Sequence, residues 1–261
     1  MLKIIIIPIL FLLLAPNGFA SINYCNESHY NNMWALLIAV GLYAGHPEQN
    51  RPSMLEALNN IKDALLSSPC WQEDHVRVIK GGNATVKNIL RGFLWLMSVS
   101  RENDFSLVYI TTHGFPIPVD IPPFDESDGK DEALASYFGF VNPLAILWDD
   151  EINFFLSLLE SKGVCLIVDS CYSGGFNDAP FFGKMNRVVL MSCKEDEISY
   201  GSVFSNYIAE GLSGKADCNH DKVITAEELF NYARERMEHW LHHPTMCDYY
   251  PGDLPVTFLA T

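Results

Sequence analysis

The sequence predicts an α/β fold in which a mostly parallel β-sheet carries helices on both faces. Short apolar runs rich in β-branched residues recur along the chain, and segments with helical spacing of apolar residues alternate with them. The runs are apolar at nearly every position, as expected for parallel strands buried on both sides. The chain has 261 residues and no internal repeat, so we expect one large domain after the N-terminal segment.

The first 20 residues have the pattern of a secretory signal peptide. Lys3 supplies the positive start, residues 4–15 form a short apolar core, and small residues precede a cleavage site after Ala20. The core is too short, and too interrupted by proline, for a comfortable membrane span, although an uncleaved anchor is the alternative. We therefore expect residues 21–261 to be the mature domain and the protein to be secreted.

The charge balance narrows the classes of partner. The chain has 32 acidic and 17 basic side chains, and its formal net charge at pH 7 is −15. So acidic a protein has no electrostatic attraction to nucleic acid or to an anionic bilayer. The same field favours basic substrates.

The expected strands and helices alternate along the chain. Strands are predicted at residues 34–41, 76–79, 107–112, 164–169, 188–192 and 256–260. Helices are predicted at residues 54–67, 149–161, 203–212 and 225–241, and after the N-cap residue Thr85. The first of these helices shows the pattern clearly, with one apolar stripe of Leu55, Leu58, Ile61 and Leu65.

The strand 164–169 leads directly to a candidate nucleophile, Cys171. Asp169 breaks the apolar run, and Gly174 and Gly175 supply a flexible loop. Open α/β sheets place their binding crevice at the carboxyl ends of the strands. A thiol in that position is accessible, whereas a cysteine inside the core is inert. We therefore interpret Cys171 as a nucleophile rather than as a core residue.

The strand 107–112 is followed by His113 and Gly114. If the two strands are neighbours in a parallel sheet, His113 and Cys171 emerge at the same edge. The imidazole would then help to form the thiolate and later protonate the leaving amine. The backbone N–H groups of Gly114 and Cys171 would hold the oxyanion of an acyl transfer. The alternative is an ordinary loop histidine.

The His113–Gly114 pair and the block from Asp169 to Gly174 resemble the caspase-like cysteine peptidases, the group of caspases, metacaspases and legumains. The likeness is greatest to microbial caspase-like or legumain-like members (C13/C14). It extends over residues 34–259, although residues 111–112 are Thr-Thr where many relatives carry Ser-Gly. Further support comes from residues 128–134, 148–152 and 192–201. The resemblance implies a caspase-like three-layer sandwich, an endopeptidase acting on peptides or proteins, and no cofactor required for catalysis.

The resemblance also gives Asp169 a role. In the legumain and metacaspase groups an acidic residue two places before the nucleophile lines the pocket for the residue before the cleaved bond. Carried over, the Asp169 carboxylate would pair with Arg or Lys of the substrate, with Ser199 and then Glu197 flanking the pocket. The alternative is that Asp169 only accepts hydrogen bonds from the backbone at the strand end.

Residues 217–228 match an EF-hand-type calcium loop. The expected ligands are Asp217, Asn219, Asp221, the Val223 carbonyl and Glu228. Lys222 stands where the sharp turn prefers glycine, and it brings a positive charge near the ion. The alternative is a loop that only caps the following helix, through a capping box of Thr225 and Glu228.

Residues 115–137 are predicted to form a long loop that borders the site. The segment has four prolines and an acidic run at residues 125–132. Two interpretations are open: a solvated acidic flap, or a segment that responds to a cation or contacts the substrate.

The remaining cysteines and a histidine cluster also have open interpretations. Cys165 and Cys193 fit buried thiols, and the four candidates for disulfide bonds are Cys25, Cys70, Cys218 and Cys247. Their pairing does not follow from the sequence. For His239, His242 and His243, a solvated helix end is favoured over a metal site, because no further ligand stands at matching spacing.

The favoured function is a secreted cysteine endopeptidase that cleaves after Arg or Lys with a dyad of Cys171 and His113. The alternatives are a legumain-like peptidase or ligase acting after Asn or Asp, an inactive caspase-like binding module, and a calcium-dependent adhesion or scaffold domain. Peptides or proteins are the expected partners, and no oligomeric state is predicted.

Overall fold

A computed structural model describes residues 30–124, 129–177, 180–237 and 242–260. The predicted signal peptide, Cys25 and His239 lie outside these ranges. Within them, no helix is both long enough and apolar enough to cross a membrane.

The centre of the fold is a six-stranded sheet with the order β10-β8-β7-β3-β1-β2. Its strands are β1 (Met33–Ala39), β2 (Val76–Lys80), β3 (Phe105–Thr111), β7 (Gly163–Asp169), β8 (Arg187–Met191) and β10 (Thr245–Asp248). The first five are mutually parallel, and β10 adds to the edge of β8 in the antiparallel direction. The mostly parallel sheet is therefore confirmed. Strand β10 was not predicted, because its residues are mixed in polarity and only partly buried.

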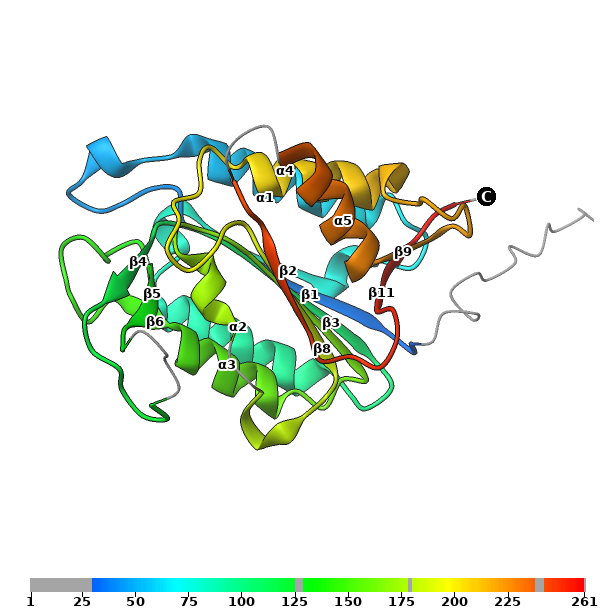
Figure 1. The fold of residues 1–261 in the computed structure, drawn as a ribbon, viewed down its shortest axis with the longest axis horizontal. Coiled ribbons are helices and arrows are strands. Elements are labelled where there is room, and N and C mark those ends of the chain that lie inside the picture. The colour runs from blue at the N-terminus through cyan, green and yellow to red at the C-terminus, as the bar shows by residue number, and fades with distance from the viewer. Residues whose placement is uncertain (1–29, 125–128, 178–179, 238–241, 261) are drawn as a thin grey trace, which may run out of the picture.

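Helices cover both faces of this sheet (Figure 1). On one face lie α1 (Pro52–Leu66), α4 (Val203–Glu210) and α5 (Ala226–Met237); on the other lie α2 (Val86–Val99) and α3 (Asp149–Leu158). The alternation of β1 explains why both faces need a cover: Leu37 belongs to the core under α1, whereas Leu36 and Ile38 belong to the core under α2. The predicted three-layer α/β sandwich is confirmed.

The predicted loop 115–137 is only partly a loop. Strands β4 (Gly114–Ile117), β5 (Asp131–Ala135) and β6 (Ile146–Trp148) form a small antiparallel sheet, and every residue of β5 is buried. The interpretation as a solvated acidic flap is therefore wrong for Asp131 and Glu132, which are 1% and 2% exposed. Residues 125–128 of the acidic run lie outside the described ranges.

The remaining elements are short. Strand β11 (Pro255–Phe258) pairs with β9 (Val223–Thr225) and does not join the central sheet. The 3₁₀ and π turns are η2 (Pro47–Gln49), η3 (Glu73–His75), η4 (Gly81–Asn83), η5 (Ser173–Phe176), η6 (Phe181–Gly183) and η7 (Gly211–Lys215).

The two cysteines predicted to be buried thiols are found in the core. Cys165 and Cys193 are fully buried thiols. Of the candidates for disulfide bonds, Cys70 is disulfide-bonded, whereas Cys218 is an exposed free thiol and the Cys247 thiol donates a hydrogen bond to the Asn177 side chain.

The loop before α5 forms the predicted capping box. The Thr225 hydroxyl accepts from the Glu228 N–H at 3.2 Å, and the Glu228 carboxylate accepts from the Thr225 N–H at 3.1 Å. Lys222 has φ = 68°, the left-handed conformation that this sharp turn favours in glycine. The Glu228 carboxylate thus accepts a hydrogen bond within the protein, as expected for a loop that only caps α5.

We predict that Thr225→Ala lowers the free energy of unfolding by about 1 kcal/mol, because the N-terminus of α5 loses an acceptor for an N–H group that has no partner inside the helix. Thr225→Ser retains the hydroxyl and is the matched control. Chemical denaturation of the three proteins measures the difference, and an alanine variant as stable as the serine variant would contradict the capping role.

Candidate active site

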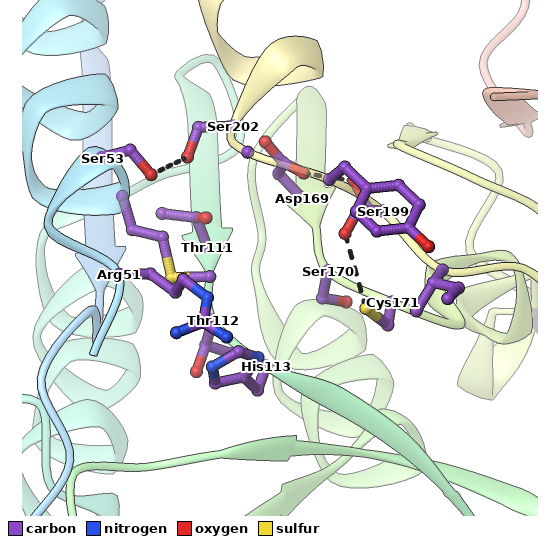
Figure 2. A pocket seen from close by; sticks show the side chains of 14 residues that line it. Arg51, Ser53, Thr111, Thr112, His113, Asp169, Ser170, Cys171, Ser199 and Ser202 are labelled. Carbon is purple, nitrogen blue, oxygen red and sulfur yellow. Dashed lines mark hydrogen bonds between the residues drawn. The ribbon is translucent and has the colours of Figure 1, made fainter. Parts of the chain in front are cut away.

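The register between two central strands brings His113 and Cys171 to the same edge of the sheet. Strands β3 and β7 are parallel neighbours, and Thr111 is paired with Asp169. His113 and Cys171 each follow their strand's paired residue by two positions, so both enter one pocket. Figure 2 shows the two side chains approaching this pocket from adjacent strand ends. The predicted juxtaposition is confirmed.

Cys171 lies at a sharp turn between β7 and η5. The next residue, Tyr172, has φ = 60°, which turns the chain away immediately after the nucleophile. The thiol donates a hydrogen bond to the Ser199 carbonyl, with 3.6 Å between sulfur and oxygen. Burial raises the pKa of Cys171 above its usual value, and the Ser199 contact offsets this only in part. In this resting arrangement the sulfur is a neutral thiol.

His113 is held in one tautomer by a backbone carbonyl. Its Nε2 lies 2.9 Å from the carbonyl oxygen of Gln49, in η2. Because a carbonyl only accepts, Nε2 carries the proton and the lone pair of a neutral ring is on Nδ1. Burial lowers the pKa of His113, and the nearby Arg51 guanidinium lowers it further. The neutral Nδ1 is therefore available as a base.

A hydrogen-bonded chain fixes the backbone of His113. The His113 N–H donates to the Tyr43 hydroxyl at 3.1 Å, and that hydroxyl is 2.9 Å from the Thr112 hydroxyl. Thr112 in turn donates to the Ala135 carbonyl in β5 at 2.6 Å. Tyr43 also places its ring against the imidazole, with 5.0 Å between ring centroids. The Thr112 hydroxyl thus has a structural role, because it accepts from the buried Tyr43 and donates to Ala135.

Gly114 brings the two loops into contact. A Cβ atom at this position would lie 2.1 Å from the Cys171 carbonyl oxygen, so only glycine fits. The Cys171 N–H donates no hydrogen bond to another described residue. Two backbone amides at this junction, with a thiol and a base beside them, suit attack on a carbonyl and stabilisation of the resulting oxyanion.

Asp169 lies inside the same pocket, which has a volume of about 280 Å³. Its carboxylate accepts from the Ser199 hydroxyl at 3.0 Å, from the Ser205 N–H at 3.2 Å and from the Ser205 hydroxyl at 2.5 Å. Ser205 accepts in turn from the hydroxyl of buried Tyr109 at 2.7 Å. These donors hold a negative charge at the base of the pocket, in a position to meet a cationic side chain.

One side of the pocket is formed by residues 194–201, named here the wall segment. Its Ile198, Ser199, Tyr200 and Gly201 line the pocket. The Glu197 carbonyl accepts from the Tyr172 N–H at 2.8 Å, so the wall segment is tied to the residue that follows the nucleophile. Glu197 itself is not among the residues that line the pocket.

A second group of ionisable side chains lies where β5 of the small sheet meets the start of α3. Carboxylate oxygens of Asp131, Asp149 and Asp150 lie within 4.8 Å of one another, and all three residues are buried. Among the described residues this is the cluster whose geometry could hold a metal ion. Burial raises the pKa of Asp149 to about 7, and the neighbouring Asp150 and Asp131 raise it too. Oxygen ligands of this kind suit a hard cation such as Ca²⁺.

Several of these residues were not identified from the sequence. Gln49 acts through its backbone carbonyl, which leaves no side-chain pattern to find. Tyr43 and Ser205 resemble ordinary polar residues until their partners are known. The pair Asp149–Asp150 was noted only as part of the resemblance, although two adjacent acidic residues at a buried helix start were an available signal.

Comparison with known proteins gives a consistent result. The sequence pattern of the family described as "Metacaspase, peptidase C14 domain" matches residues 35–180. The chain is 28% identical to metacaspase-1 of Eremothecium gossypii over 66% of this chain and 38% of that protein. It is 29% identical to metacaspase-1 of Botryotinia fuckeliana over 83% of this chain and 53% of that protein. The chain spans about half the length of the curated relatives it matches.

Two solved structures share the fold. Caspase-1 from Spodoptera frugiperda superimposes with a TM-score of 0.62 at 12% identity, covering 89% of this chain and 92% of that one. A protein of Geobacter sulfurreducens superimposes with a TM-score of 0.62 at 14% identity, covering 88% of this chain and all of that one.

We predict that the Cys171 thiol ionises only at high pH, so that its alkylation is slow at neutral pH. The thiolate is the reactive form, and a raised pKa postpones it. The rate of iodoacetamide labelling at Cys171, followed by peptide mass spectrometry, should still be rising at pH 9. Cys171→Ala is the control, because any labelling of that variant comes from other thiols such as the exposed Cys218. A rate already constant at pH 7 would indicate a preformed thiolate–imidazolium pair instead.

Proposed function

This chain belongs to the metacaspase family of C14 peptidases, and we propose that it is a secreted cysteine endopeptidase that cleaves after arginine or lysine. The observation that carries the proposal is the β3–β7 register, which places a base, a nucleophile and a buried carboxylate in one pocket. Secretion is inferred from the N-terminal signal pattern.

The reaction begins when the substrate displaces the resting contact of the thiol with Ser199. The Cys171 proton passes to Nδ1 of His113 as the sulfur attacks the peptide carbonyl, and the Gln49 carbonyl stabilises the imidazolium through Nε2. The amides of Gly114 and Cys171 receive the negative charge on oxygen. His113 then gives its proton to the leaving amine, and water, deprotonated by His113, hydrolyses the thioester and restores the thiol.

Asp169 would select the residue before the cleaved bond. Its carboxylate is held by three hydrogen bonds from Ser199 and Ser205, so it does not have to reorganise when a cation arrives. A guanidinium or ammonium group in the pocket would gain a charge-assisted hydrogen bond in a partly dehydrated site. The acidic net charge of the protein adds long-range attraction for basic substrates.

We predict cleavage of fluorogenic peptides with Arg or Lys before the reporter, and no cleavage by Cys171→Ala. Asp169→Asn removes the charge that the pocket presents, so kcat/KM for these peptides should fall about a hundredfold. Asp63→Asn, at an exposed position on α1, is the matched control and should leave the rate unchanged.

The same panel separates the other functions. Cleavage only after Asn or Asp would favour the legumain-like alternative, and transfer to an added amine in place of water would indicate a ligase. If the mature protein cleaves no peptide and Cys171 does not react with a peptide-based thiol probe, the inactive binding module, or the calcium-dependent adhesion or scaffold domain, becomes the better interpretation.

We further propose that calcium supports the fold at Asp131, Asp149 and Asp150 rather than at residues 217–228. Three buried carboxylates repel one another, and a hard cation would offset that repulsion. Asp131 begins β5, which pairs with the strand that contains Gly114. An ion there would steady the hairpin behind the oxyanion amides, and it would supply no step of the reaction.

We predict that calcium raises the thermal midpoint more at pH 8 than at pH 5. The folded-state pKa of Asp149 is raised to about 7, so between pH 4 and pH 7 the folded state keeps a proton that the unfolded state has lost. The stability contributed by that proton is present at low pH and is lost as the pH rises to 7, where a cation can take its place. Differential scanning fluorimetry with calcium and with chelator measures the effect.

The two candidate calcium sites, the carboxylate cluster and residues 217–228, are distinguished by matched variants. Asp149→Asn should abolish the calcium shift, whereas Glu228→Gln should retain it. The reverse pattern would assign calcium to the EF-hand-type loop.

A further inference from the structure

The C-terminal segment 242–245 lies against the outer side of the wall segment. It is anchored to the central sheet through Thr245, which begins β10 and pairs with Met191 of β8. The Thr245 hydroxyl donates to the carbonyl of Cys193, the residue just before the wall segment, at 3.3 Å. Buried His242 packs edge-on against the Tyr200 ring, with 5.3 Å between centroids.

The closest of these contacts joins the side chains of His243 and Glu197. Nδ1 of His243 is 2.6 Å from the Glu197 carboxylate. The carboxylate also accepts from the Lys194 N–H at 3.4 Å, and the Lys194 ammonium is 3.9 Å away. Burial alone would raise the pKa of Glu197, but His243 and the Lys194 amide outweigh it and hold that pKa below its usual range. The carboxylate is therefore ionised when the imidazole is protonated.

The inner side of the same turn touches the nucleophile. The Glu197 carbonyl accepts from the Tyr172 N–H at 2.8 Å and from the buried Cys193 thiol at 3.3 Å. Two residues further on, Ser199 accepts from Cys171 and donates to Asp169. The turn 194–197 thus contacts the C-terminal segment on one side and the residue that follows Cys171 on the other. Its position therefore sets the position of Ser199.

We propose that His243 is a positioning residue of the active site, which holds the wall segment against Cys171 and Asp169 by clasping Glu197. The inference rests on the proposed peptidase function for its kinetic consequence. The clasp is strongest when the imidazole is protonated, because a neutral ring keeps at most a hydrogen bond to the carboxylate. Among the described residues, Lys194, on the wall segment itself, is the other cation in an ion pair with Glu197.

The test compares wild type with His243→Gln, Glu197→Gln and the double variant on an Arg substrate at pH 5.5 and pH 8.5. Lys62→Gln is the matched control, since it removes a surface ion pair to Glu73 of 3.1 Å on α1 and η3. Titration of Cys171 and His113 occurs in every protein and cancels in the ratio to wild type. Hydrogen exchange of residues 194–201, followed by mass spectrometry, reports the order of the wall segment without reference to activity.

We expect kcat/KM of His243→Gln to fall about fivefold at pH 5.5 and by less at pH 8.5, because only a protonated imidazole forms an ion pair with the Glu197 carboxylate. The double variant should be no worse than Glu197→Gln alone, because both changes remove one interaction. Exchange of residues 194–201 should be faster in His243→Gln at pH 5.5, and thermal stability should match that of Lys62→Gln.

A pH-independent loss, additive effects of the two substitutions, or unchanged exchange of the wall segment would each overturn the clasp. If wild type cleaves no peptide, the proposed function fails separately. In that case the exchange experiment alone decides whether His243 positions the wall segment.

Discussion

The parallel pairing of β3 with β7 is the constraint on which the candidate site depends. Each strand is fully buried, so a slip of one residue would move apolar side chains between the two cores that flank the sheet. The register is therefore determined by the whole core, and the equal offset of His113 and Cys171 beyond Thr111 and Asp169 follows from it. Burial far from the site thus sets the geometry of the reacting groups.

The core determines where the dyad is but not its chemical state. In the resting structure the Cys171 thiol bonds to the Ser199 carbonyl, and the His113 ring bonds to the Gln49 carbonyl. Burial raises the pKa of the thiol and lowers the pKa of the imidazole, so both groups are neutral. An ion pair between Cys171 and His113 would form only if the negative charge that develops on the substrate's carbonyl oxygen were stabilised. The N–H groups of Gly114 and Cys171 are placed to stabilise it. In the proposed mechanism, charge separation is thereby coupled to the presence of a carbonyl substrate.

Sequence patterns predicted the parts of the molecule that are governed by local periodicity. The apolar runs and helical stripes located the five parallel strands of the central sheet and the five α-helices of the described residues, because burial leaves a clear periodic pattern. They did not locate β4, β5 and β10, whose sequences are short and contain proline or charge. The fold of the segment 115–137 depends on burying Asp131 and Glu132, which composition alone would place in solvent.

The same division applies to the site. His113, Cys171 and Asp169 follow strand ends and could be identified from the sequence, together with Gly114. Tyr43 and Gln49 could not, because their roles arise from contacts with residues about 64 to 70 positions away. The histidine cluster was interpreted as a solvated helix end. Instead His242 and His243 lie beyond the last described turn of α5 and contact the wall segment, a tertiary arrangement with no local signature.

The segments around the pocket share a location in the fold that determines how easily they can change conformation. The loop that contains Tyr43 and Gln49, the wall segment and the C-terminal segment 242–245 all lie at or beyond strand ends, and none of them is an interior strand of the central sheet. Segments of this kind open at a lower free energy than the core strands that position the dyad. Some of the contacts that connect these segments to the residues around the dyad, such as Gln49 with His113 and Glu197 with Tyr172, are single hydrogen bonds. If His243 clasps Glu197 and a cation binds at Asp149 as proposed, a change in either contact would alter the order of the pocket without unfolding the sheet beneath it. The core strands therefore fix the position of Cys171, whereas the segments that surround it can change conformation more easily.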